Sequence, residues 1–330
     1  MKKIAAILMA GILALSLAGC GNVAQDSINR HKSATVVLTL ALRDGTYADV
    51  IEECVTKFEE ENGVKCDILK LSEADLHDKI ADSGENGGVD LCMVDGSWIA
   101  EFASGGYLAN LYELGYELDG DIIDATTDIS YYDGNLYVTP YYGNVTVLLY
   151  NKELISSTSY GEITYPSSED LLDMCTQVKG SGKLGFMYRG DTENNVVVDF
   201  LPFLLSQGGW VVDDENRPTV DTTEFKDAVK YYKELIATGD KTSKDDLVMA
   251  IEGGNAAMAI AWPGWYTPTG GGSADYVALP GKQDASAVAY NANVYGVWTL
   301  GISAKSENQK MTEKLLEYLM DPEVQKETID

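Results

Sequence analysis

The hydrophobic positions of this chain alternate between runs of strand length and stretches with helical spacing. Residues 36–42 and 89–94 are largely apolar runs of strand length, residues 64–71 are a further expected strand, and residues 50–58 place apolar side chains at helical intervals. Gly63 follows this helical stretch and is a typical helix stop. Strands that alternate with helices predict an α/β fold in which right-handed crossovers build a doubly wound, mostly parallel sheet.

The same alternation continues through the second half of the chain. We predict strands at residues 146–150, 184–188 and 256–261, and helices after Pro166 and at residues 225–236, 247–252 and 311–320. Ser167 or Ser168 is the expected N-cap of the helix after Pro166. Residues 180–185 match the phosphate-binding pattern GxGxxG, but Leu184 stands where a phosphate loop needs Ser or Thr, and a strand rather than a helix follows. This stretch is therefore interpreted as a turn.

The first twenty residues have the pattern of a lipoprotein signal peptide. Two lysines are followed by an apolar run at residues 4–18 and by small residues before Cys20. The run is shorter than the roughly 20 residues that a membrane-spanning helix needs. We expect cleavage of residues 1–19, a lipid on Cys20 that anchors the protein to the extracytoplasmic face of the cell membrane, and a tether at residues 20–33.

Charge and composition exclude several function classes. The chain has 52 acidic and 24 basic residues, for a net charge of −28, and the acidic residues are spread along its length. Such a surface repels nucleic acid and anionic lipid. The only histidines are His31 and His77, which argues against a serine–histidine triad or a multi-histidine metal site. We expect no catalytic residue, no metal and no cofactor.

Size and cysteine usage complete this outline. The mature chain of about 310 residues is longer than chains that fold around a single hydrophobic core, so two lobes are expected. The remaining cysteines occur without a CxxC pair and are expected to be small buried hydrophobes. The alternative is a disulfide, whose pairing the spacing does not give. They are Cys54, Cys66, Cys92 and Cys175.

The loops that follow the predicted strands are the first candidates for a ligand site, because ligands bind at the carboxyl ends of strands in such sheets. Arg43 and Asp44 follow the first strand, and Asp95 and Trp98 follow the third. A solvated turn is an equal alternative for the first pair, and the alternative for Trp98 is that it covers the start of a helix beside Phe102. Trp262 and Trp265 directly follow the strand at 256–261, where two tryptophans among Pro and Gly rarely serve only as core.

Seven short segments, in their order along the chain, resemble the extracellular solute-binding proteins of carbohydrate-importing ABC transporters, the family of maltose- and trehalose/maltose-binding proteins. These segments are FEEENGV at 58–64, GYLANL at 106–111, DGNLYVTP at 133–140, LYNKEL at 149–154, GGNAAM at 253–258, LPG at 279–281 and GIS at 301–303.

The resemblance implies two α/β lobes with a sugar clamped between them, a monomer, and delivery to ABC permease subunits. It assigns residues 34–140 and 281–320 to lobe I and residues 141–280 and 321–330 to lobe II. It places chain crossings near 139–144, near 278–281 and near the chain end. Relatives continue beyond the segment that resembles 311–325, so the C-terminal part of lobe II is expected to be missing.

The resemblance also assigns residues to the sugar site. It places Arg43 and Asp44 in the first sugar-contacting loop, Asp95 and Trp98 in the second, and Tyr142 on the first crossing. The remaining implied contacts are Asn144, where relatives often have a carboxylate, together with Trp262, Gly264 and Trp298, to which the residue pattern after the strand at 256–261 adds Trp265. Residues 196–198 are valines where maltose-binding protein has aromatic contacts, which argues against a long malto-oligosaccharide.

Three other functions remain as alternatives at this point. A ferric-ion or polyamine receptor would use the tyrosine pairs at 131–132 and 141–142, and a glycoside hydrolase would use two carboxylates such as Asp44 and Asp95. A surface lipoprotein that only scaffolds a partner is the third. The tryptophans favour a sugar-binding protein that is not an enzyme, because flat rings bury the apolar faces of sugars.

Overall fold

The computed structural model describes residues 36–163, 166–268, 271–279 and 293–327. The expected signal peptide, Cys20 and the tether with His31 lie outside these residues. The chain divides into two compact units, with breaks after Tyr142 and after Gly296. Unit 2 is Gly143–Gly296, and unit 1 contains the segments on either side of it.

Unit 1 contains a five-stranded sheet in the order β2-β1-β3-β12-β6. Strands β1 and β2 are parallel along their whole length, β3 is parallel to β1, and β12 is antiparallel to β3. The strands are β1 (Val36–Arg43), β2 (Val64–Leu71), β3 (Leu91–Asp95), β6 (Val138–Val145) and β12 (Tyr295–Ile302). The carboxyl ends of β1 and β3 therefore lie side by side at one edge of the sheet.

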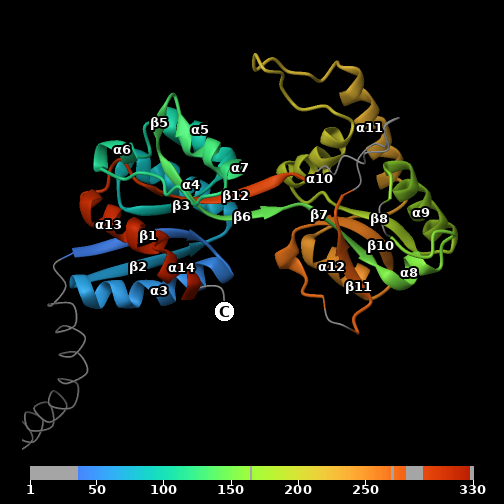
Figure 1. The fold of residues 1–330 in the computed structure, drawn as a ribbon, viewed down its shortest axis with the longest axis horizontal. Coiled ribbons are helices and arrows are strands. Elements are labelled where there is room, and N and C mark those ends of the chain that lie inside the picture. Colours follow the sequence, from blue (N-terminus) through green and yellow to red (C-terminus); the bar gives the residue numbers. More distant parts are fainter. Residues whose placement is uncertain (1–35, 164–165, 269–270, 280–292, 328–330) are drawn as a thin grey trace, which may run out of the picture. The chain divides into compact units, whose positions relative to one another are not determined.

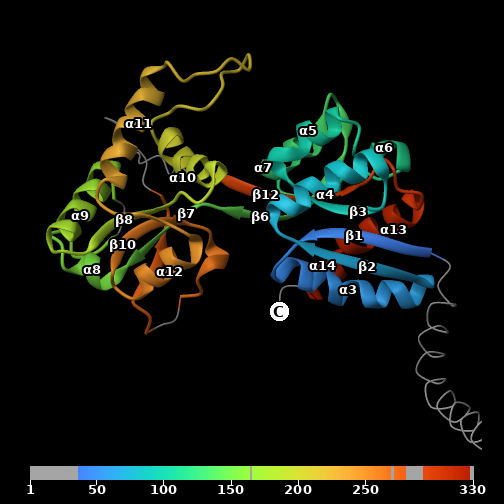
Figure 2. The same cartoon turned by 180° about the vertical axis from the view of Figure 1, so that it is seen from behind.

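The longer helices of unit 1 are α3 (Thr46–Asn62), α4 (Glu73–Asn86) and α13 (Gln309–Met320), and α3 runs beside β2 in both views (Figures 1 and 2). Gly63 ends α3 in the left-handed conformation, with φ 64°, as its sequence position predicts. The shorter elements are η1 (Gly96–Trp98), α5 (Ile99–Ser104), α6 (Leu111–Leu114), α7 (Asp124–Thr127), η2 (Asp128–Ser130), β4 (Tyr131–Tyr132), β5 (Asn135–Leu136) and α14 (Pro322–Glu327).

Unit 2 contains a mixed sheet in the order β11-β7-β10-β8-β9. Strand β8 is parallel to both β10 and β9, whereas β7 is antiparallel to β10 and to β11. The strands are β7 (Val147–Asn151), β8 (Leu184–Arg189), β9 (Lys241–Thr242), β10 (Ala256–Ala261) and β11 (Ala274–Val277). The helices are α8 (Lys152–Ser156), α9 (Ser168–Gly180), α10 (Glu193–Ser206), α11 (Thr223–Ile236), α12 (Lys244–Glu252) and the short η3 (Pro263–Trp265).

The sheet of unit 2 is buried on both faces. Along β10, Met258 and Ile260 belong to one hydrophobic cluster, while Ala259 and Ala261 belong to another. Phe186 and Met187 of β8 divide between the same two clusters. Successive side chains of a strand point to opposite faces, so a strand buried on both faces has a continuous apolar run. This explains why the apolar run at 256–261 predicts β10 correctly.

The predicted α/β fold with two lobes is confirmed, and most predicted elements are present. Ser167 caps α9 through a capping box with Asp170, as expected for this position. Residues 180–185 lead from α9 into β8, as the turn interpretation requires. Helix α10 has no counterpart among the predictions, because three consecutive valines and Pro202 disfavour a helix locally.

The chain crosses between the units at positions that differ from part of the expectation. The first crossing lies within β6, close to the expected 139–144. The return lies within β12, after Gly296, and not near 278–281. Helix α14, expected in the second lobe, belongs to unit 1, where Gln325 donates a hydrogen bond to the Leu319 carbonyl at 2.8 Å.

Cys54, Cys66, Cys92 and Cys175 are all unpaired thiols. Cys92 and Cys175 are completely buried, and this burial raises their thiol pKa values to about 12. These two therefore act as small buried hydrophobic side chains, as the sequence indicates, whereas Cys54 and Cys66 are only half-buried. Within the residues described, no helix combines the length and the apolar character that spanning a membrane requires.

Candidate functional site

Four strands of unit 1 bring its candidate residues together. Arg43 is the last residue of β1, and Asp95 is the last residue of β3. Because β12 is antiparallel to β3, its residue Trp298 lies directly opposite Asp95. Tyr142 comes from β6, which neighbours β12 in the sheet.

Arg43 packs its guanidinium on the indole of Trp298. The distance from its Cζ to the ring centroid is 5.2 Å, within the range of a cation–π contact. Its Nη2 lies 3.7 Å from a carboxylate oxygen of Glu73, and its buried Nε has no hydrogen-bond partner in the part of the chain described. The Arg43 side chain as a whole is 40% exposed, so other atoms of its guanidinium are open to a ligand.

Trp98 and Trp298 meet edge to face. Their ring centroids are 5.5 Å apart and the rings are inclined by 85°. Trp98 also contacts Phe102 and His77, with centroid distances of 6.0 and 5.0 Å. Both indoles are half-buried, so each is held in place and still has open surface. The packing of Trp98 on Phe102 agrees with the alternative that Trp98 covers the start of a helix. The contact of Trp98 with Trp298 also places Trp98 in the candidate site.

Tyr142 is covered on one face by Tyr47, a residue that the sequence reasoning does not select. The two rings are stacked with centroids 3.4 Å apart and an inclination of 9°. Tyr142 is half-buried and its pKa is raised mainly by burial, with Arg43 opposing the shift. Tyr47 is 40% exposed, so it is the outer ring of the pair.

The two acidic candidates of unit 1 differ in their surroundings. Oδ1 of Asp95 accepts hydrogen bonds from the backbone N and the hydroxyl of Ser97, at 2.9 and 2.7 Å, and so caps η1. Neither of these two hydrogen bonds uses Oδ2, the other carboxylate oxygen. Asp44 is exposed, and its backbone N donates to the Leu71 carbonyl at 2.8 Å. Its side chain therefore fits a solvated turn as well as a ligand contact.

Unit 2 holds a second group after β10. Trp262 follows the strand directly, and its carbonyl accepts a hydrogen bond from Trp265 N at 2.9 Å, which closes the tight turn η3 around the exposed Gly264. The Tyr276 hydroxyl donates to the carbonyls of Trp262 and Pro263. Several hydrogen bonds thus fix the turn that carries both tryptophans.

The indole of Trp262 lies against the backbone of Gly296 in β12. A Cβ at Gly296 would stand 2.8 Å from the Trp262 ring, closer than real contacts allow. Gly296 is therefore required for this close approach, rather than for an unusual backbone angle.

Gly296→Ala should displace the Trp262 ring without unfolding unit 2, because the obstructed group is the end of a side chain. If Trp262 contacts the ligand, we expect about tenfold weaker binding. Titration of tryptophan fluorescence with ligand measures this. Gly180→Ala at the end of α9 is the matched control, since Gly180 lies outside the candidate site and a Cβ there meets nothing within 4 Å. Equal affinities for the two variants would contradict this assignment of Trp262.

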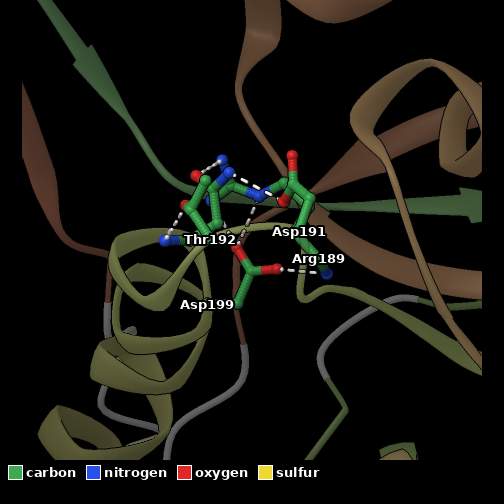
Figure 3. Close-up of polar contacts among 5 residues, drawn as sticks. Arg189, Asp191, Thr192 and Asp199 are labelled. Atoms are coloured by element: carbon green, nitrogen blue, oxygen red, sulfur yellow. Dashed lines mark hydrogen bonds and ion pairs between the residues drawn. The ribbon is translucent and has the colours of Figure 1, made fainter. Parts of the chain in front are cut away.

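Trp265 packs on an arginine that comes from β8. The Cζ of Arg189 lies 4.9 Å from the ring centroid of Trp265. Strands β8 and β10 are parallel neighbours, so Arg189 at the end of β8 and the turn after β10 share one edge of the sheet. Figure 3 shows Asp199 of α10 turned toward Arg189, whose Nε donates to it at 3.0 Å.

Asn144, the remaining candidate, lies on β6 and is half-buried. Its Oδ1 accepts a hydrogen bond from the backbone N of Val145 at 3.0 Å. The amide NH₂ group is the part of this side chain that can serve a ligand.

Six of the predicted residues therefore fall into two groups, one in each unit. Unit 1 joins Arg43, Trp98, Tyr142 and Trp298, and unit 2 joins Trp262 and Trp265. Sequence reasoning missed Tyr47 and Arg189. Arg189 directly follows the strand predicted at residues 184–188, so the rule that selects Arg43 would have found it.

Comparisons with known proteins agree with this fold. A family model described as bacterial extracellular solute-binding protein matches residues 42–326. The galactooligosaccharide-binding protein of Bacillus subtilis (strain 168) is 25% identical over 187 residues, which cover 56% of this chain and 43% of the relative. Maltodextrin-binding protein MdxE of the same organism is 25% identical over 277 residues, covering 78% and 62%. The chain thus matches less than two thirds of the length of either relative.

Solved structures share the fold. Maltose-bound MalE3 of T. maritima superposes with a TM-score of 0.73 at 22% identity, covering 88% of this chain and 78% of that one. The GacH receptor of Streptomyces glaucescens GLA.O, also solved with acarbose, gives a TM-score of 0.74 at 23% identity, covering 89% and 78%.

Proposed function

Because the chain belongs to the bacterial extracellular solute-binding proteins, we propose that it is a lipid-anchored receptor that captures a disaccharide or oligosaccharide and delivers it to an ABC permease. The observation that carries the proposal is the group in unit 1, in which Arg43 packs on Trp298 and Trp298 meets Trp98. The same proposal makes the protein a monomer without a catalytic residue, a metal or a cofactor.

The chemistry of this group suits a sugar. Sugars present apolar C–H faces and an edge of hydroxyl groups. Half-buried indoles supply flat apolar area, and Arg43 and Asp95 supply hydrogen-bonding groups that fix orientation. The names of the two relatives, a galactooligosaccharide-binding and a maltodextrin-binding protein, support the same ligand class.

We assign contact with the ligand to both units. In unit 1 the contacts are Arg43, Asp44, Asp95, Trp98, Tyr142 and Trp298, and in unit 2 they are Asn144, Trp262, Gly264 and Trp265. On this proposal the lobes correspond to the two units, and closure over the sugar requires a higher affinity for the closed state. The two chain crossings, in β6 and β12, are where backbone rotation would be absorbed.

The other ligand classes have weaker support. Iron binding needs phenolate ligands, but burial raises the pKa of both Tyr141 and Tyr142, which disfavours the phenolate. A hydrolase would need two free carboxylates, whereas Asp95 already caps η1. A polyamine would suit the acidic chain, but the group in unit 1 carries a cation, the Arg43 guanidinium, on its tryptophan ring.

A thermal-shift panel of mono-, di- and oligosaccharides, with ferric iron and spermidine as competitors, tests the proposal. A sugar at 100 times its dissociation constant should add about 2.7 kcal/mol of apparent stability. Stabilisation by iron or spermidine alone, or release of sugar products on long incubation, would contradict it.

Cys20→Ala tests the anchor. The variant should be absent from the membrane fraction of producing cells or remain unprocessed, because the lipid is the proposed attachment. Membrane fractionation and mass spectrometry of the N-terminus measure this, with Cys54→Ala as the control that leaves the leader intact. Normal processing together with full membrane retention in the variant would argue against a lipoprotein.

A further inference from the structure

The guanidinium of Arg189 is fixed from several sides. Its Nε and Nη2 donate to Oδ1 of Asp199, and its Nη1 donates to Oδ1 of Asn195 at 2.7 Å. The backbone N of Arg189 donates to the other oxygen of Asp199 at 2.9 Å. Asp199 therefore holds both the end of β8 and the side chain that leaves it, as Figure 3 shows.

This network is part of the start of α10. Thr192 caps the helix by accepting a hydrogen bond from Asn195 N, and Asn195 Nδ2 donates to Asp191 at 2.9 Å. The side chain of Asn195 thus links the loop after β8 to Arg189. The orientation of the guanidinium follows from the helix start and from a carboxylate one turn further along.

The fixed guanidinium packs on the ring of the half-buried Trp265, with its Cζ 4.9 Å from the ring centroid. Arg189 is only 7% exposed and three of its N–H groups are already used, so it is poorly placed to bind a ligand directly. Its planar group instead matches the flat ring of the indole.

We propose that Arg189 is a positioning residue that holds the Trp265 indole in its ligand-binding orientation, with Asp199 and Asn195 as its supports. This inference rests on the proposed function, in which Trp265 contacts the sugar. Fixing the ring before binding lowers the entropy that the complex must lose. Lysine cannot replace arginine here, because an ammonium lacks the planar fork that bonds Asp199 and Asn195 while stacking on a ring.

Sugar titrations on four proteins test the coupling: wild type, Arg189→Lys, Trp265→Ala and the double variant. Arg189→Lys should weaken binding about tenfold in the wild-type background and less than about twofold when Trp265 is absent. Arg217→Lys is the control, because Arg217 forms an ion pair with Asp213 on the surface. Equal losses in both backgrounds, or none in either, would overturn the proposal.

Tryptophan fluorescence without ligand gives a second readout. Arg189→Lys should shift the emission and increase quenching by acrylamide, and both changes should vanish in the Trp265→Ala background. This measurement does not depend on sugar binding. If the wild type binds no sugar, the proposed function fails, while the fluorescence still decides whether Arg189 holds the ring. An unchanged emission would overturn the positioning role.

A paired substitution separates positioning from stability. Arg189→Met combined with Asp199→Leu replaces the buried ion pair by apolar groups of similar size, which proteins often tolerate. This variant should fold, but it should bind sugar about tenfold more weakly than the wild type. Wild-type affinity in the folded double variant would show that the guanidinium has no role in binding.

Discussion

Asp199→Ala should lower the free energy of unfolding by about 3–5 kcal/mol, one of the largest effects of any single substitution in the chain. Asp199 is completely buried, and the variant would leave the Arg189 guanidinium buried without its main partner. Burial raises the pKa of Asp199, while the charge and hydrogen bonds of Arg189 oppose that shift, so each group depends on the other. Urea unfolding followed by circular dichroism measures the loss.

Asp213→Ala is the matched control. Asp213 also pairs with an arginine, Arg217, but on the surface, where water screens the charges and the change in stability should be much smaller. The apolar replacement of both Arg189 and Asp199 should recover most of the stability that Asp199→Ala loses. Equal stability of Asp199→Ala and Asp213→Ala would contradict the importance of the buried pair.

Trp298→Ala should weaken sugar binding about ten- to hundredfold, taking the scale of aromatic stacking in other binding proteins. The variant removes the ring on which Arg43 packs and which meets Trp98. Strand β12 keeps its backbone pairing with β3, so the variant should fold. Calorimetric titration and urea unfolding on the same preparation measure both properties.

Trp210→Ala is the control for this substitution, because Trp210 is 40% exposed and lies outside both groups of candidate residues. If Trp298 were ordinary core, its removal would instead cost about 3–5 kcal/mol of stability. A large loss of stability with unaltered affinity in the folded fraction would refute its place in the site.

Local signals explain why so much of the fold can be predicted. The end of α3 at Gly63 and the start of α9 at its N-cap Ser167 can be predicted, because each helix end depends on a few neighbouring residues. The continuous apolar run of β10 requires burial on both faces, whatever the partner strands are. Helix α10 shows the limit, since the packing of Phe203 and the bonds of Asp199 outweigh the low propensity of its valines and Pro202.

For the candidate site, too, local rules find some residues, while tertiary packing decides the contacts between them. The rule that ligands bind at strand ends finds Arg43, Asp95 and Trp98, because it depends only on the order of strands. The contact of Trp98 with Trp298 depends on the antiparallel register of β12, which no local pattern indicates. Likewise, the stacking of Tyr47 on Tyr142 and the contact of Arg189 with Trp265 arise only from tertiary packing.

Isothermal titration calorimetry of the wild-type protein, at several temperatures, tests the central claim most directly. The titrant is the sugar that stabilises the protein most. We predict saturable binding of one sugar per chain with a negative heat-capacity change, because the tryptophan rings and the C–H faces of the sugar lose contact with water. No saturable heat with any sugar, together with saturable binding of spermidine or ferric iron, would contradict the account.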